Sequence, residues 1–132
     1  MDINIDTQPL KGQTVLITGA ARRLGNFMAL TLSKAGCNVI VHYNNSKEQA
    51  EALVKAVQQI GSKAWLVGAD ISTEKGLLQL SEDAFSITPV TAIINNASIF
   101  TNETFSETTL STWQENLQVN LHLIVDSEQM FP

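Results

Sequence analysis

Short apolar runs bounded by turn residues alternate with segments of helical period along this chain. Each run has the length and continuous apolar character of a strand that is covered on both faces. The predicted strands are residues 14–18, 39–43, 64–67 and 91–94. Strands that alternate with helices in this way predict βαβ units, and therefore a parallel sheet with right-handed crossovers.

The first two helices are predicted from apolar spacing and from their ends. Gly36 is placed to end the first helix in a left-handed cap. The apolar face of that helix consists of Leu24, Phe27, Met28, Thr31 and Leu32. The second helix opens with a capping-box pattern, in which Ser46 and Gln49 satisfy free backbone amides. Its buried stripe consists of Ala50, Leu53, Val54, Val57 and Ile60.

Two further helices follow the same logic. The third is predicted over about residues 73–85, and a last helix is predicted to begin near Ser111. The residues that this last helix carries on its apolar face are Trp113, Leu117, Asn120, Leu121 and Ile124.

Composition narrows the classes of function. The 132 residues suit one domain, and 8 basic against 13 acidic residues give a net charge of -5, which disfavours nucleic acid or an anionic membrane as partner. Any phosphate must therefore be held locally. Cys37 is the single cysteine, so we expect no intrachain disulfide, and we predict no metal site. An acidic N-terminus and the lack of a ~20-residue apolar run predict a cytoplasmic protein.

A glycine-containing turn after the first strand is the main candidate binding site. Residues 18–25 read TGAARRLG, and the following helix would present free amides to the turn. Glycine lets the backbone approach a pyrophosphate, and a helix N-terminus carries about half a positive charge. An ordinary tight turn is the alternative, because the common G-x-G-x-x-G spacing is missing.

This turn resembles the T-G-x-x-x-G-x-G fingerprint of the short-chain dehydrogenase/reductase family, with Arg23 where the middle glycine usually stands. The form T-G-A-A-[RK]-R-L-G is similar to that of pteridine reductases and of bacterial dihydrofolate and dihydromonapterin reductases. The resemblance implies cofactor contacts from Thr18, Gly19, Leu24 and Gly25. It also implies that Arg23 lies near the pyrophosphate and the substrate.

The end of the second strand bears on the choice of cofactor. An NAD enzyme places an acid here for the ribose 2′-hydroxyl, whereas this chain continues from His42 through Asn44, Asn45 and Ser46 without a carboxylate. Arg22, with Ser46 and the two asparagine amides, could hold a 2′-phosphate, so NADP(H) is favoured over NAD. The related pteridine reductases often have a basic residue in place of Asn45, which implies that this chain binds the 2′-phosphate more weakly. A merely polar loop is the alternative.

Two motifs extend the resemblance. Asp70 and Ile71 match positions that contact adenine in the family, although Asp70 could equally cap a helix in a solvated turn. Asn95, Asn96 and Ala97 resemble the start of the family's N-N-A-G motif at the cofactor cleft.

The residue after that motif points to the substrate side of the cleft. Ser98 in place of glycine, followed two residues later by Phe100, is similar to the pteridine reductases. Both are candidate substrate contacts, with Phe100 as a stacking platform. A phenylalanine that anchors the core or a loop is nearly as good an interpretation of Phe100.

Asn120 is the one catalytic candidate. A polar residue on a buried helix stripe needs hydrogen-bond partners, and the resemblance implies that this asparagine kinks the helix and fixes a water in the proton relay. The family's catalytic tyrosine and lysine are expected further along, but only twelve residues follow Asn120. Tyr43 and Lys47 form a Y-x-x-x-K string, which we reject because it spans a strand end and a first helical turn.

Together these patterns predict one domain over residues 1–132 with an α/β fold. It is a Rossmann-type three-layer α/β/α unit with a parallel sheet in order 3-2-1-4, truncated before the second half. The resemblance implies an NADP(H)-binding reductase of a small-molecule carbonyl or pterin-like C=N substrate, in a homo-oligomer. The alternatives are a non-catalytic NADP(H)-binding or interaction module, and catalysis completed by a separate chain that carries the missing half.

Overall fold

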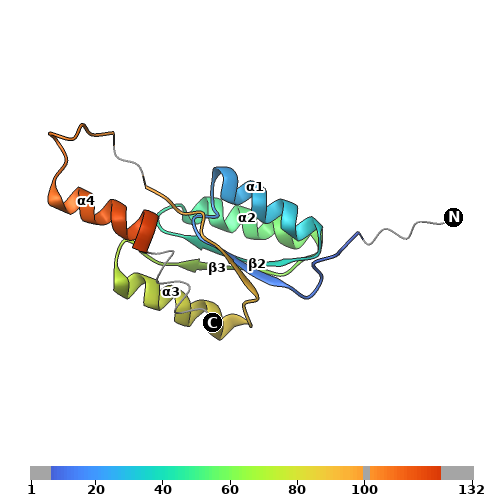
Figure 1. Ribbon diagram of the computed structural model, residues 1–132. Coiled ribbons are helices and arrows are strands. Elements are labelled where there is room, and N and C mark those ends of the chain that lie inside the picture. Colours follow the sequence, from blue (N-terminus) through green and yellow to red (C-terminus); the bar gives the residue numbers. More distant parts are fainter. Residues whose placement is uncertain (1–6, 100–101, 123–132) are drawn as a thin grey trace.

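The computed structural model describes residues 7–99 and 102–122 and follows the predicted alternation (Figure 1). The strands are β1 (Thr14–Ile17), β2 (Asn38–Tyr43), β3 (Ala64–Gly68) and β4 (Ala92–Ile94). The helices are α1 (Arg23–Lys34), α2 (Lys47–Ile60), α3 (Glu74–Ile87) and α4 (Leu110–Leu117), after which a π-helical segment, η1 (Gln118–His122), continues α4.

All four strands form one parallel sheet in the order β3-β2-β1-β4, which confirms the predicted topology. Leu16 of β1 stands beside Ile40 of β2 on one side and Ile93 of β4 on the other. Within the residues described, no strand pairs with the outer edge of β4.

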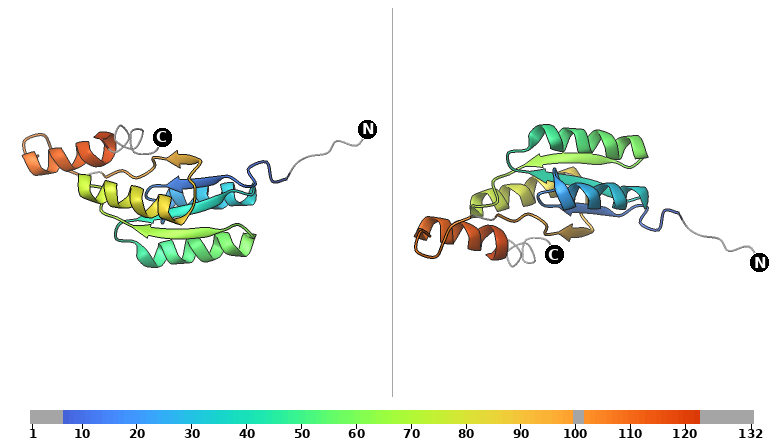
Figure 2. Two further views of the ribbon diagram at one scale, coloured as in Figure 1. Left: turned by 90° about the horizontal axis from the view of Figure 1, so that it is seen from below. Right: turned by 90° about the horizontal axis from the view of Figure 1, so that it is seen from above.

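Two apolar cores lie on opposite faces of the sheet and give the predicted three layers. Helices α1 and α2 cover one face and α3 covers the other (Figures 1 and 2). Val15 and Ile17 of β1 pack in the core under α1 and α2, whereas Leu16 packs with Leu77 and Leu80 of α3. Successive residues of β1 point to opposite faces, so its continuous apolar run matches a strand that is buried on both.

The predicted apolar face of α1 is right only in part, because Met28 and Leu32 are partly buried and pack against the core. Leu24 and Phe27 are 61% and 67% exposed, and the residues that α1 buries are Gly25, Ala29 and Ser33. A helix whose sheet-facing positions are small can lie close to the strands, and in α1 Leu24 and Phe27 lie outside this contact. Apolar spacing located the helix, but it assigned the large apolar side chains to the buried face, where the structure has small residues.

The helix ends are predicted with mixed success. Gly36 follows α1 with φ of 95°, and its amide donates to the carbonyl of Ser33, as the left-handed cap requires. The stripe of α2 is confirmed at Ala50, Leu53, Val54 and Val57, which are buried, whereas Ile60 is half-buried. The capping box is wrong: Ser46 occupies the N-cap position but its side chain accepts no hydrogen bond from the helix amides.

The last helix departs most from its prediction. Residues 110–117 contain no buried residue, and Trp113 is 56% exposed. The wider π-helical winding after residue 117 shifts the phase of the following side chains, so Val119 is buried and Asn120 is exposed. Ile124 lies outside the described residues.

None of the helices in the described part of the chain is long and apolar enough to span a bilayer.

Candidate functional site

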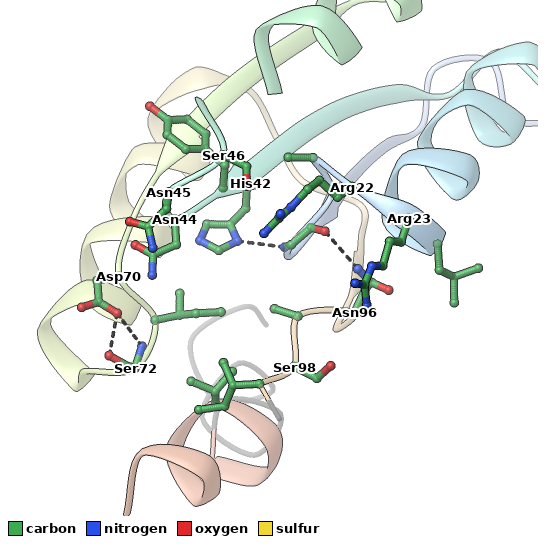
Figure 3. A pocket seen from close by; sticks show the side chains of 18 of the residues that line it. Arg22, Arg23, His42, Asn44, Asn45, Ser46, Asp70, Ser72, Asn96 and Ser98 are labelled. Atoms are coloured by element: carbon green, nitrogen blue, oxygen red, sulfur yellow. Dashed lines mark hydrogen bonds between the residues drawn. The ribbon is translucent and has the colours of Figure 1, made fainter. Parts of the chain in front are cut away.

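A cavity of about 660 Å³ opens at the carboxyl ends of the strands (Figure 3). Helix α4 lies beyond the same ends of the strands (Figure 2). The crossovers from β1 to β2 and from β3 to β4 run on opposite faces of the sheet, so the cavity lies where an open parallel sheet places its ligand crevice. The predicted site residues that line it are Gly19, Arg22, Arg23, Leu24, His42, Asn44, Asn45, Ser46, Asp70, Ile71, Asn96, Ala97 and Ser98.

The two arginines of the turn between β1 and α1 point to different sides of this cavity. In the close-up, Arg22 extends toward His42 and the end of β2, whereas Arg23 lies beside Asn96 (Figure 3). Arg23 has φ of 54°, the only positive φ among the described residues other than glycine. An arginine held in a left-handed conformation costs stability, so its place in a cavity wall indicates a functional constraint.

Glycine is needed at the start of α1 because the turn packs tightly against it. A Cβ added at Gly25 would lie 2.7 Å from Nδ2 of Asn96 and 2.7 Å from the carbonyl oxygen of Gly19. A Cβ at Gly19 would lie 3.0 Å from Cα of Ala97. These approaches hold the turn against the end of β4 and leave its cavity side open.

Thr18 and Asn96 tie the ends of β1 and β4 together. The Thr18 hydroxyl accepts from the amides of Asn96 and Ala97 at 3.0 and 3.1 Å. The Asn96 side-chain amide donates to the carbonyls of Thr18 and Gly19 at 3.1 and 3.2 Å. Thr18, Gly25 and Asn95 are not among the residues that line the cavity, and Thr18 shapes the site through these bonds.

His42 joins three strand ends from a buried position. Its side chain is 1% exposed, its Nδ1 accepts from the amide of Gly19 at 3.0 Å, and its Nε2 donates to the carbonyl of Ala69 at 2.9 Å. Both partners have a single role, since an amide can only donate and a carbonyl can only accept. The ring is therefore the neutral Nε2–H tautomer, and burial lowers the pKa of His42 from its ordinary value of 6.5.

The loop after β2 has the composition expected for a phosphate. Asn44 and Asn45 are exposed and Ser46 is half-buried, and no carboxylate stands between β2 and α2. Tyr43 is the last residue of β2 and packs on Gly68, where an added Cβ would lie 2.8 Å from the ring. Lys47 begins α2, so the rejected Y-x-x-x-K string does not share a helix.

Asp70 lies in an exposed turn, but it does not cap the helix. Its Oδ1 accepts from the amide and the hydroxyl of Ser72 at 3.0 and 2.6 Å. Thr73 caps α3 by accepting from the amide of Gly76. The solvated-turn interpretation is therefore right and the capping interpretation is wrong, while Asp70 and the buried Ile71 both line the cavity.

Asn120 does not line the cavity. Its Oδ1 accepts from the amide of Ile99 at 2.9 Å and its Nδ2 donates to the carbonyl of Ile99 at 2.9 Å. Ile99 does line the cavity, so Asn120 holds the backbone of a wall residue in place. Asn120 has the partners that we expected it to need, although it is exposed. Phe100 lies outside the described residues.

Several residues of the wall were not predicted from the sequence. They are Ala21, Tyr43, Ser72, Ile99, Glu115 and Val119. Glu115 and Val119 are four residues apart, the spacing that places two side chains on one helix face, and the D-x-S pattern at residues 70–72 was a signal for the turn around Asp70. The rest depend on the turns and on the placement of α4, which local patterns do not reveal.

Comparison with known proteins places this site in a family. The family model described as short chain dehydrogenase matches residues 13–131. The chain belongs to the short-chain dehydrogenase family. Among curated relatives, tetrahydroxynaphthalene reductase of Pyricularia oryzae is 41% identical over 59% of this chain and 28% of its own length. The 3beta-hydroxysteroid dehydrogenase 1 of Eggerthella lenta is 34% identical over 85% of this chain and 43% of its own.

Solved structures agree with this placement in the short-chain dehydrogenase family. A 3-oxoacyl (acyl-carrier-protein) reductase from Agrobacterium tumefaciens, with NADP bound, matches with a TM-score of 0.87 and 32% identity. The match covers 98% of this chain and 50% of that one. This short-chain dehydrogenase chain thus spans half the length of that reductase, and less than half of the two curated relatives.

Proposed function

We propose that this chain binds NADP(H), and that the protein to which it belongs is an NADPH-dependent reductase of a small-molecule carbonyl. The observation that carries the proposal is the direction of Arg22, which extends over the cavity toward the carboxylate-free loop after β2 (Figure 3). A 2′-phosphate needs charge-assisted donors, and an acid in that loop would repel it.

The cavity fits a dinucleotide in two further respects. Gly19 and Gly25 keep the turn so close to β4 that a side chain at either position would collide with the wall. The donors available for phosphates are the guanidinium groups of Arg22 and Arg23 and the first amides of α1, which carries no acidic residue in its first turn. Arg22 with Asn44, Asn45 and Ser46 would hold the 2′-phosphate, and Asp70 with Ile71 the adenine.

The bound cofactor would supply a hydride to the substrate carbon. The chain's own residues would orient it: Arg23 and Asn96 lie on the opposite side of the cavity from the loop after β2 (Figure 3). Asn120 would serve the proton relay of the family from its position beside Ile99, and it is a positioning residue in the contacts described. The similar proteins support reduction of carbonyls, since the A. tumefaciens protein is a 3-oxoacyl (acyl-carrier-protein) reductase.

A pterin-like C=N substrate is the finer form of the proposal. It is supported by Arg23 in a left-handed conformation that glycine would adopt more easily, and by Ser98 exposed in the cavity wall. Ser98 and Phe100 would be the substrate contacts, and the assembly would be a homo-oligomer.

The competing function is an NADP(H)-binding module without catalysis. Among the described residues the single tyrosine, Tyr43, packs on Gly68 at the end of β2, so these residues by themselves support binding of the cofactor. Mixing the purified chain with NADPH and a panel of carbonyls and pterins distinguishes the two. Loss of NADPH absorbance with a substrate supports the reductase, whereas binding without turnover supports the module.

A further inference from the structure

His42 is buried, and a buried polar side chain needs hydrogen-bond partners. The described contacts show two, one on each ring nitrogen, and they lead to different strands: Gly19 after β1 and Ala69 after β3. The backbone of the same region adds two more links, because the amide of Ala20 donates to the carbonyl of His42 and the amide of Ala69 donates to the carbonyl of Tyr43. The end of β2 thus connects the turn after β1 to the loop after β3, which contains Asp70.

The bond to Gly19 has a specific effect on the turn. Gly19 has φ of 61° and is the first residue after Thr18, where the chain reverses toward α1. With its amide directed at Nδ1 of His42, that amide is not presented to the cavity, and the amides that remain for a phosphate are those nearer the start of α1. The imidazole therefore selects one orientation of the peptide that begins the turn.

We infer that His42 is a positioning residue for the cofactor: its neutral Nε2–H imidazole locks the Gly19 amide and thereby holds the phosphate-binding turn in its receptive shape. The inference deepens the proposed function and depends on it for the identity of the ligand. A proton on Nδ1 would set two donors against each other at Gly19, so protonation would release the turn.

The charged groups around the cavity bear on that protonation. Arg22 and Arg23 of the turn oppose a positive ring, whereas Asp70 after β3 and Glu115 of α4 favour one. Burial is the leading physical cause that lowers the pKa of His42, and the hydrogen bond to Ala69 acts in the opposite direction. The neutral ring is therefore the native form near neutral pH.

Two substitutions separate the two bonds. In His42→Asn the side-chain oxygen can take the place of Nδ1 and accept from Gly19, while the bond to Ala69 is lost. In His42→Gln the side-chain nitrogen can take the place of Nε2 and donate to Ala69, while the bond to Gly19 is lost. Each variant removes one hydrogen bond from the same buried position, so each is the matched control for the other.

The first readout is the dissociation constant of NADP+ by calorimetric titration at pH 8. We expect His42→Asn to stay within about threefold of the wild type and His42→Gln to weaken binding about tenfold, the value of one hydrogen bond. Equal weakening of both variants, or no change in either, would overturn the inference, because a merely structural role does not distinguish the two bonds. Thermal unfolding of both variants, run beside the titration, identifies a variant that does not fold.

The second readout compares the wild type with His42→Asn from pH 8 to pH 5.5. The 2′-phosphate itself takes up a proton near pH ~6, but it does so for both proteins, so the ratio of their dissociation constants isolates the imidazole. We expect wild-type affinity to fall more steeply than that of His42→Asn as the pH drops. Parallel curves would contradict the inference.

The third readout needs no cofactor and separates this inference from the proposed function. Hydrogen exchange at the Gly19 amide of the free protein should be slow in the wild type and in His42→Asn, and faster in His42→Gln. If no variant binds NADP+ but the exchange pattern holds, the proposed function fails and the positioning role of His42 stands. If exchange at Gly19 is the same in all three proteins, the positioning role fails.

Discussion

Asn120 makes a two-point contact with Ile99, accepting from its amide and donating to its carbonyl, both at 2.9 Å. The contact joins the π-helical segment after α4 to the loop after β4, 21 residues earlier in the chain. Through it a helix with no buried residue of its own is attached to the cavity wall.

We expect Asn120→Ala to reduce the free energy of unfolding by about 1 kcal/mol, because the two hydrogen bonds are exposed and each contributes modestly. Urea unfolding measures the change, and faster hydrogen exchange at the Ile99 amide locates it. Asn102→Ala, at another exposed position, is the control and should leave both values unchanged. An unaltered Ile99 amide in Asn120→Ala would contradict the role given to this contact.

Arg23→Gly should change stability and cofactor binding in opposite directions. Relief of the left-handed φ should raise the free energy of unfolding by about 1 kcal/mol, since glycine adopts this conformation freely. Loss of the guanidinium should weaken NADP+ binding about tenfold. The neighbouring Arg22 has φ of -139°, so Arg22→Gly is the control and should gain no stability. A loss of stability in Arg23→Gly would show that φ is not the source of strain.

Gly25→Ala should be strongly destabilising, because its Cβ would lie 2.7 Å from two polar atoms of the wall. We expect a loss of at least about 2 kcal/mol in the free energy of unfolding, as for other overpacked sites. Asn26→Ala, one residue further along α1, should stay within about 0.5 kcal/mol of the wild type. Equal unfolding midpoints for the two variants would argue against the close packing.

The free energy of unfolding should decrease as the pH falls, because His42 takes up a proton more readily in the unfolded chain. In the unfolded chain this imidazole takes up a proton near its ordinary pKa of 6.5, whereas burial lowers the pKa in the native state. The unfolded state therefore binds more protons between the two values, so stability is complete above pH 6.5 and is lost as the pH falls toward the native pKa. The slope can reach about 1.4 kcal/mol per pH unit.

Urea unfolding of the wild type and of His42→Asn at a series of pH values checks this slope. The difference between the two proteins should grow as the pH falls from 7 to 5, on the order of 1 kcal/mol in total. A constant difference would mean that His42 does not titrate on unfolding.

The outer edge of β4 should drive self-association of the chain. Ala92 is exposed there, and within the described residues the strand has a partner only in β1. Unpaired edges present backbone donors and acceptors to a second chain, and a charge on the edge opposes this pairing. We expect light scattering to show dimers or larger species that Ala92→Lys reduces. A monodisperse monomer in the wild type would contradict the expectation.

The sequence predicted the sheet better than the helix surfaces, for a physical reason. A strand buried on both faces reads as an unbroken apolar run, so β1 and β2 and their order could be inferred. A helix face depends on how closely the helix approaches the sheet. The small residues Gly25 and Ala29 decided this for α1, and Phe27 turned outward.

The site was predictable where one motif supplies both the residue and its position. The turn at residues 18–25 and Asn96 after β4 come together as expected, whereas Asn95 does not line the cavity. Ser46 failed as a capping residue, and the burial of Asn120 failed because the helix changes its winding after residue 117. The spacing of apolar residues reveals neither the rotation of a side chain nor a local π-helix.

The proposed preference for NADP(H) depends on a phosphate site shared by Arg22 and the loop after β2. Calorimetric titration of the chain with NADP+ and NAD+ in the same buffer tests it most directly. We predict that NADP+ binds at least about tenfold more tightly than NAD+, and that Arg22→Gln removes most of this difference while leaving NAD+ affinity near the wild-type value. Equal affinities for the two dinucleotides, or no binding of either, would contradict it.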